Sequence, residues 1–144
     1  MVERIASILP ANGPVVHSVS PDVPIYDALV MMASREIAAV LVIEQGELLG
    51  IVSAKDYATK VVLQGKNGRD VLTREVMTTP VVTVAPEVKI VDAMQIMISK
   101  KFRHLPVFEN GELVGVVTLA ELVRAILADQ TFQIDQLMKY IGHR

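Results

Sequence analysis

The chain has 144 residues, a formal net charge of −2 and no cysteine, which excludes disulfides, thiolate metal sites and cysteine nucleophiles. Without a basic excess, neither nucleic acid nor an anionic membrane is an expected partner. Hydrophobic residues make up 51% of the chain and aromatic residues only 4%, which predicts an aliphatic core. No signal peptide is visible and no apolar run approaches the ~18 residues of a membrane span, so we expect a soluble cytoplasmic protein.

The chain repeats itself after its first residues, where Met1–Leu9 predicts a short helix ended by Pro10. Residues 16–57 and 81–122 align without a gap at a constant offset of 65, and 16 of the 42 aligned pairs are identical. This predicts two copies of one supersecondary unit related by an approximate two-fold axis. A stretch of roughly 60 residues buries little surface alone, so we expect one shared core and a ligand site at the seam between the copies.

Each copy predicts the order strand, helix, strand, strand, helix. In copy one these elements are Val16–Val19, a helix with the apolar stripe Ile25, Ala28, Leu29 and Met32, then Val40–Ile43, Leu48–Val52 and Lys55–Leu63. In copy two they are Val81–Val84, a helix with the stripe Ile90, Ala93, Met94 and Met97, then Leu105–Phe108, Leu113–Val117 and Ala120–Ala128. A turn that contains glycine joins the two middle strands of each copy, at Gly46 and at Gly111.

The remaining segments connect or flank the copies. Gln64–Arg69 is rich in glycine and polar residues and predicts an exposed linker, from which Val71–Met77 leads into copy two. After Asp129 the apolar residues predict a C-terminal amphipathic helix that covers the module or packs on a partner chain.

The junction between the last strand and the last helix of each copy carries a hydroxyl and an acid three residues apart. These are Ser53 and Asp56 in copy one, and Thr118 and Glu121 in copy two. One interpretation is a capping box, in which each side chain satisfies a free backbone N–H of the other residue. The other is that the acid accepts hydrogen bonds from a ribose diol, while the free N–H groups at the start of the helix favour an anion. Both interpretations stay open at this point.

A second motif is the run Phe102-Arg103-His104-Leu105-Pro106, where copy one has Ile37-Ala38-Ala39-Val40-Leu41. Arg offers a fork of donors suited to phosphate, and His adds a donor whose charge depends on pH. The alternative is a surface Arg beside a hydrogen-bonded His at the edge of a strand.

Catalysis finds little support in the chain. The three histidines, at positions 17, 104 and 143, form no Ser-His-Asp order, and no His, Asp or Glu cluster has metal-ligand spacing. There is no Walker loop and no G-x-G-x-x-G motif. We therefore expect a non-enzymatic protein without a metal.

The doubled unit resembles a tandem pair of cystathionine-β-synthase (CBS) domains, a Bateman module of the stand-alone bacterial type. The resemblance rests on the motifs V-V-T-V-A-P-E, F-R-H-L-P-V, N-G-E-L-V-G-V-V-T and G-I-V-S-A-K-D, together with S-x-x-D-Y-x-x-K-V-V-L-x-G, and covers about residues 14–128. On this basis the expected divisions are residues 14–64 for the first repeat, 65–78 for a linker, 79–128 for the second repeat and 129–144 for a C-terminal helix.

The resemblance implies an α/β fold in which two β-α-β-β-α repeats pack face to face about a pseudo-two-fold axis, with flanking helical segments. It also implies an adenosine ligand (AMP, ADP, ATP, NAD(H) or S-adenosylmethionine) in the cleft between the repeats, and a homodimer. Carried over by position, Asp56 would hold the ribose, and Arg103 and His104 would reach the phosphate. The other residues of this primary cleft would be Ile51, Ser53, Lys55, Thr79, Pro80, Val81 and Phe102.

The second cleft departs from the family pattern. Its acid is Glu121, and its expected phosphate position holds Ala38 and Ala39 in place of Arg and His. Its other residues would be Val15, Val16, Val116 and Thr118. We therefore expect the Asp56 cleft to bind phosphorylated adenosine well, and the Glu121 cleft to bind weakly, to take a less charged group or to stay empty.

Two functions of different classes follow from these observations. The first is a regulatory sensor of adenine nucleotides, in keeping with energy sensing and signal transduction, which acts on an effector protein that the sequence does not name. The second is a protein-interaction scaffold whose clefts are degenerate or empty.

Overall fold

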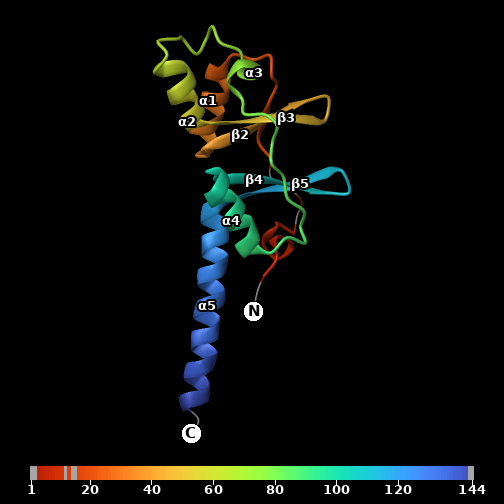
Figure 1. Ribbon diagram of the computed structural model, residues 1–144, viewed down its shortest axis with the longest axis vertical. Helices are drawn as coiled ribbons and strands as arrows, with labels where there is room; N and C mark the ends of the chain where they lie inside the picture. Colours follow the sequence, from red (N-terminus) through yellow and green to blue (C-terminus); the bar gives the residue numbers. More distant parts are fainter. Residues whose placement is uncertain (1–2, 12, 14–15, 143–144) are drawn as a thin grey trace. The chain divides into compact units, whose positions relative to one another are not determined.

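The computed structural model describes residues 3–11, 13 and 16–142 and has a mixed α/β fold (Figure 1). The chain divides into two compact units. We call residues Val16–Val81 the repeat-1 unit, and residues Met1–Val15 together with Val82–Arg144 the repeat-2 unit. Among the predicted positions, residues 1–2 of the expected N-terminal helix, Val15, residue 14 at the expected domain start, and residues 143–144 of the C-terminal segment lie outside the described residues.

The repeat-1 unit contains a three-stranded sheet in the order β1-β2-β3, with β1 parallel to β2 and β2 antiparallel to β3. Its elements are β1 (Ser18–Val19), α1 (Ile25–Arg35), β2 (Ala39–Glu44), β3 (Glu47–Ser53), α2 (Ala54–Tyr57), the π-helical turn η2 (Ala58–Val62) and α3 (Thr73–Val76). The predicted order of strand, helix, strand, strand, helix is therefore confirmed, and the last helix changes its hydrogen-bond spacing at Ala58.

Within its described residues, the repeat-2 unit keeps the order helix, strand, strand, helix but forms no first strand, so its sheet has two strands. Its elements are η1 (Ile5–Ile8), α4 (Ile90–Lys100), β4 (His104–Glu109), β5 (Glu112–Thr118) and α5 (Leu119–Gly142). The antiparallel pairing of β4 with β5 repeats that of β2 with β3 at the offset of 65, and both hairpins shift register after the fourth pair, at Val42/Ile43 and Val107/Phe108.

The strand predicted at Val81–Val84 is reduced to a single bridge, Val84 with Val107. In the repeat-1 unit, the backbone N–H of Leu41 donates to the His17 carbonyl and extends the pairing of β1 with β2. The equivalent residue in the repeat-2 unit is Pro106, which has no backbone N–H to donate. The prediction of a full strand at Val81–Val84 is wrong for this reason.

The turns and the helical stripes follow the sequence. Both residues of each hairpin turn have positive φ, 51° and 78° at Gln45-Gly46 and 53° and 79° at Asn110-Gly111, as tight hairpins require. The helix stripes are buried, with Leu29 and Met94 partly exposed at their edges. The buried side chains form two clusters, one within each unit, and the expectation of one shared core stays a prediction.

A helical turn from elsewhere in the chain completes each unit. In the repeat-2 unit, η1 donates from Ile5 N–H to the Val88 carbonyl and from Ala6 N–H to the Pro86 carbonyl. In the repeat-1 unit, α3 makes the same two bonds, from Thr73 to Val23 and from Arg74 to Pro21. The segment in front of each repeat therefore packs on the other repeat. Two sequence predictions change accordingly: the N-terminal helix is one 3-10 turn, and the segment after the linker is part of the repeat-1 fold.

The last helix is longer than predicted. The sequence predicts a helix over Ala120–Ala128 and a separate C-terminal helix after Asp129, whereas α5 runs without a break from Leu119 to Gly142 and extends well beyond α4 (Figure 1). No proline or glycine interrupts this stretch, and the Gln133 amide donates to Asp129 one helical turn earlier, at 3.0 Å. No helix within residues 3–11, 13 and 16–142 is long and apolar enough to cross a membrane.

Met77 and Thr78 pass close to β3 at Gly50, and a matched pair of glycine variants tests how much this contact limits the size of the side chain there. A Cβ on Gly50 would lie 2.7 Å from Met77 Sδ and 3.0 Å from the Thr78 carbonyl oxygen, whereas a Cβ on Gly115 would meet only the end of the Leu9 side chain, at 3.0 Å. We expect Gly50→Ala to destabilise the protein by about 1–3 kcal/mol and Gly115→Ala to cost clearly less, because backbone cannot yield as a side-chain end can. Thermal and chemical unfolding of both variants measures the difference, and an equal loss would contradict it.

Candidate functional site

The carboxylate of Asp56 has three polar contacts at the point where β3 passes into α2. The Asp56 Oδ2 atom accepts from the Ser53 backbone N–H at 2.9 Å and from the Ser53 hydroxyl at 3.0 Å. The Ser53 hydroxyl in turn accepts from the Asp56 backbone N–H at 3.1 Å. The capping box expected from the sequence is thus formed, and it fixes the carboxylate at the start of the helix.

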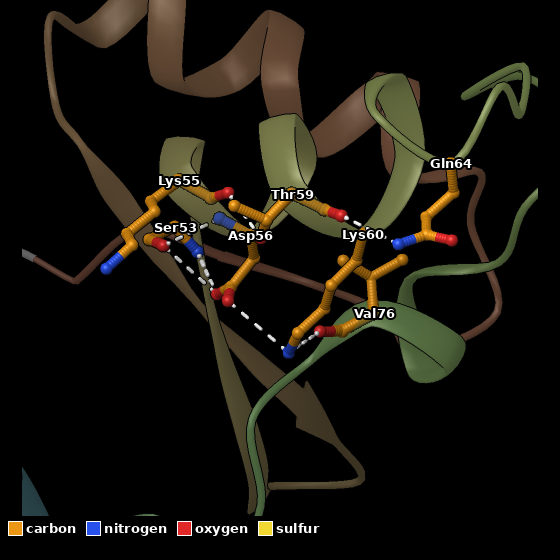
Figure 2. A network of polar contacts seen from close by, with 7 residues as sticks. All are labelled: Ser53, Lys55, Asp56, Thr59, Lys60, Gln64 and Val76. Carbon is orange, nitrogen blue, oxygen red and sulfur yellow. Dashed lines mark hydrogen bonds and ion pairs between the residues drawn. The ribbon is translucent and has the colours of Figure 1, made fainter.

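Lys60 adds a second contact to the same carboxylate (Figure 2). Its Nζ atom lies 3.3 Å from Asp56 Oδ1 and donates to the Val76 carbonyl at 2.9 Å. One lysine thereby ties the helix start to the end of α3, sixteen residues later in the chain. A carboxylate has about four lone-pair sites, so the cap and Lys60 leave Asp56 capacity for another donor.

Lys60 is not among the site residues predicted from the sequence. Its contact with Asp56 could have been predicted, because an acid followed four residues later by a lysine on a helix is a standard ion-pair spacing. Here the pair lies across the change from α2 to the π-helical turn η2. The residue that aligns with Lys60 in copy two is Ala125, which carries no charge.

The segment that follows α3 lies along β3, next to Ile51. Ile51 and Thr78 exchange two backbone hydrogen bonds, of 3.2 and 2.9 Å. The peptide bond from Thr79 to Pro80 is cis, both residues are exposed, and Val81 is half-buried. The repeat-1 unit therefore brings together the junction residues and the base-flanking segment of the predicted primary cleft. Lys55 of that set is exposed at the start of α2.

The equivalent junction of the repeat-2 unit forms the same cap. The Glu121 Oε1 atom accepts from the Thr118 backbone N–H and from the Thr118 hydroxyl, both at 3.0 Å, and the Glu121 N–H donates to that hydroxyl at 3.2 Å. Both hydroxyl-acid pairs are therefore capping boxes, whichever acid they use. The functional interpretation of the acids is not tested by this geometry.

Arg103 and His104 lie beside this second junction. His104 stands opposite Thr118 in the pairing of β4 with β5, and the Arg103 carbonyl accepts from the Leu119 N–H at 2.9 Å. Burial lowers the pKa of His104 from its usual value of 6.5, and the Arg103 charge lowers it further, whereas Glu121 opposes the shift. His104 is therefore neutral at pH 7 in this environment. Arg103 itself is exposed.

The two alanines that replace this pair occupy the same places in the repeat-1 unit. Ala39 stands opposite Ser53, and the Ala38 carbonyl accepts from the Ala54 N–H at 3.0 Å. Each unit therefore places the acid of one predicted cleft at the junction whose neighbours were predicted to contact phosphate in the other cleft. The Asp56 junction has Ala38 and Ala39 beside it, and the Glu121 junction has Arg103 and His104. The pairing of Asp56 with Arg103 and His104 stays a prediction from the resemblance.

The other predicted residues take less distinctive places. Phe102 packs against the apolar cluster of the repeat-2 unit, and Val16 and Val116 are half-buried. No group of three His, Asp or Glu side chains that could hold a metal ion occurs within residues 3–11, 13 and 16–142.

Comparison with known proteins identifies the fold. The family model described as CBS domain matches residues 8–62 and 73–128. A relative from Bacillus subtilis, the CBS domain-containing protein YhcV, is 36% identical over 107 residues, which are 74% of this chain and 76% of YhcV. The mitochondrial CBS domain-containing protein CBSX3 of Arabidopsis thaliana is 32% identical over 125 residues, which are 83% of this chain and 61% of CBSX3. The chain thus spans less than two thirds of CBSX3.

Solved structures agree with this assignment. A putative signal-transduction protein with CBS domains from Burkholderia ambifaria superposes with a TM-score of 0.83 at 34% identity, over 90% of this chain and 96% of that one. CBSX2 in complex with AMP superposes with a TM-score of 0.71 at 25% identity, over 89% and 98%. The chain belongs to the CBS domain family and carries two tandem copies of the domain.

Proposed function

We propose that this chain is a non-enzymatic regulatory protein that binds an adenine nucleotide, with the Asp56 junction as the ribose-binding end of the site. The observation that carries the proposal is the fixed carboxylate of Asp56, which the Ser53 cap and Lys60 hold in place while one lone-pair site stays free. The AMP complex of CBSX2 supports the choice of ligand class. The homologues are CBS domain proteins whose names describe no enzyme.

The chemistry of the junction suits a ribose. A ribose hydroxyl offers an O–H donor for the remaining lone-pair site of Asp56, and a charged acceptor makes such a hydrogen bond roughly twice as strong as a neutral one. Under the proposal, Arg103 and His104 supply the donors for the phosphate, as the resemblance implies. AMP, ADP, ATP and NAD(H) all carry this ribose and at least one phosphate, so the proposal covers each of them.

The proposal includes the asymmetry between the two acids. Asp56 is held by a cap and a lysine, whereas Glu121 has an alanine, Ala125, at the position of that lysine. We propose that the Asp56 site is the stronger one. A homodimer, a role in energy sensing and an effector protein as the target are further parts of the proposal, and the cytoplasm stays the predicted location.

Isosteric substitutions of the two acids test the site and its asymmetry. Asp56→Asn removes the charge but keeps an oxygen that can accept from the Ser53 N–H, so the cap persists. We expect the dissociation constant for AMP to rise about 10–100-fold, the equivalent of 1.5–3 kcal/mol. Glu121→Gln is the matched control and should leave the stronger binding step unchanged. Calorimetric titration of AMP into both variants gives the answer, and equal losses would refute the asymmetry.

Lys60 is expected to act as a positioning residue for Asp56. Lys60→Ala frees the carboxylate and the Val76 carbonyl, and we expect AMP to bind about tenfold more weakly as a result. Lys66→Ala removes the same charge from an exposed position after η2 and controls for the change in net charge. If both variants bind AMP like the wild type, Lys60 has no part in positioning.

The titration of His104 tests its predicted contact with phosphate. In the free protein, burial keeps the pKa of His104 below 6.5, so this side chain is neutral at pH 7. A phosphate close to the ring favours the charged form, and we expect saturating AMP to raise the pKa. NMR titration of the imidazole C–H signals, assigned with His104→Gln, follows both states. A midpoint that AMP does not move would contradict the contact.

The scaffold function is the second candidate, and the exposed apolar face of α5 favours it. Mass spectrometry of small molecules released from the purified, denatured protein separates the two functions. A nucleotide at close to one per chain supports the sensor. Repeated absence of a nucleotide, together with no thermal shift on addition of AMP, ATP or NADH, supports the scaffold.

A further inference from the structure

The C-terminal half of α5 carries apolar side chains that are not among those packed against the core of the repeat-2 unit. Every side chain from Gln130 to Ile141 is exposed, including large apolar ones such as Ile134 and Leu137, at 60% and 58%. The packed first turns of α5 already provide the helix nucleus, so its extension to Gly142 requires no new nucleation. The exposed apolar side chains of this half would gain free energy from burial against another surface.

Five apolar residues of α5 and Gln130 form one narrow stripe, which we call the α5 stripe. Its members recur at spacings of four, three, four, three and four: Val123, Leu127, Gln130, Ile134, Leu137 and Ile141. This is the alternating a and d spacing of a coiled coil. Leu122 and Ile126, which contact the core of the repeat-2 unit, lie on a neighbouring face, so the stripe stays exposed along its length.

We propose that the α5 stripe pairs with the same stripe of a second copy of this chain, as two parallel helices in register. The spacing places Ile134 and Ile141 at a positions and Leu137 at a d position, the combination that favours two strands, whereas Leu127 at an a position and Val123 at a d position do not follow it. Gln130 is the polar member of the seam, at a d position. Its amide can bond to the same amide of the second copy, and such a residue fixes register.

Surface area and charge also favour a second copy. Six apolar side chains on or beside the stripe, among them Met138, expose on the order of 100 Å² each, so two copies would bury about 1,200 Å², the lower end of the range for stable interfaces. The other faces of α5 beyond Leu122 carry two basic and two acidic side chains: Arg124, Lys139, Asp129 and Asp135. Two copies therefore do not repel each other, and a surface without basic excess does not suit an anionic membrane.

Cysteine cross-linking of the full chain tests the pairing directly, because the natural chain has no cysteine. Gln130→Cys places the new thiols of two paired copies face to face in the seam, within reach of a disulfide. Asp135→Cys lies outside the stripe on the same exposed half of the helix and is the matched control. We expect oxidation to convert most of the Gln130→Cys protein to a covalent dimer and little of the Asp135→Cys protein. Equal cross-linking of both, or none of Gln130→Cys, would overturn the proposal.

A second variant separates this pairing from a dimer formed through another surface. In the Gln130→Cys background, Ile134→Asp with Leu137→Asp buries unpaired charges in the seam, and we expect the cross-link to disappear and the dissociation constant of the pair to rise about 100-fold or more. Light scattering over a concentration series measures the dissociation constant. Thermal melting and AMP titration show that both repeat units stay folded. Unchanged cross-linking in this variant would show that the copies meet through another surface, and it would overturn the proposal.

Discussion

The fold depends on a reciprocal exchange of two short segments. The turn η1 satisfies the carbonyls of Val88 and Pro86 in the second repeat, and α3 satisfies those of Val23 and Pro21 in the first. These carbonyls stand between the first strand and the first helix of each repeat, where neither element can pair them. Ile5 and Val76 add apolar contacts to the two cores. Neither repeat is complete on the residues of its own stretch of sequence.

The exchange also sets the geometry of the candidate site. Because α3 packs on the repeat-1 unit, its last carbonyl lies within reach of Lys60, and the next residues pair with Ile51 along β3. Gly50 allows this segment to approach closely, and Leu9 stands in the equivalent place beside Gly115. The two units thus have equivalent backbone arrangements. They differ in the charges that they carry, with Lys60 in one unit and Arg103 and His104 in the other.

The sequence predicted well wherever a local pattern decides the structure. Periodicity located the helices, the glycine turns located the hairpins, and the hydroxyl-acid spacing predicted both capping boxes. The sequence-based prediction failed where a single residue or a contact with a distant segment determines the local structure. Pro106 shortens a strand that hydrophobicity predicts, and Asp129 does not end α5, because an acid inside a helix can bond to the next turn. Lys60 was missed because its second partner, the Val76 carbonyl, is on a segment assigned to the linker.

By itself, the sequence determined the doubled unit, the family resemblance and the difference between the two acids, because all three are carried by residue identity at fixed spacing. Only the tertiary structure decided which segment completes which repeat, since backbone hydrogen bonds between distant residues leave no periodic mark. It also decided which side chains form the buried cluster of each unit and that Asp56 is held from two sides. A cap is local and can be predicted from four residues, whereas the contact of Lys60 with Val76 depends on how α3 packs.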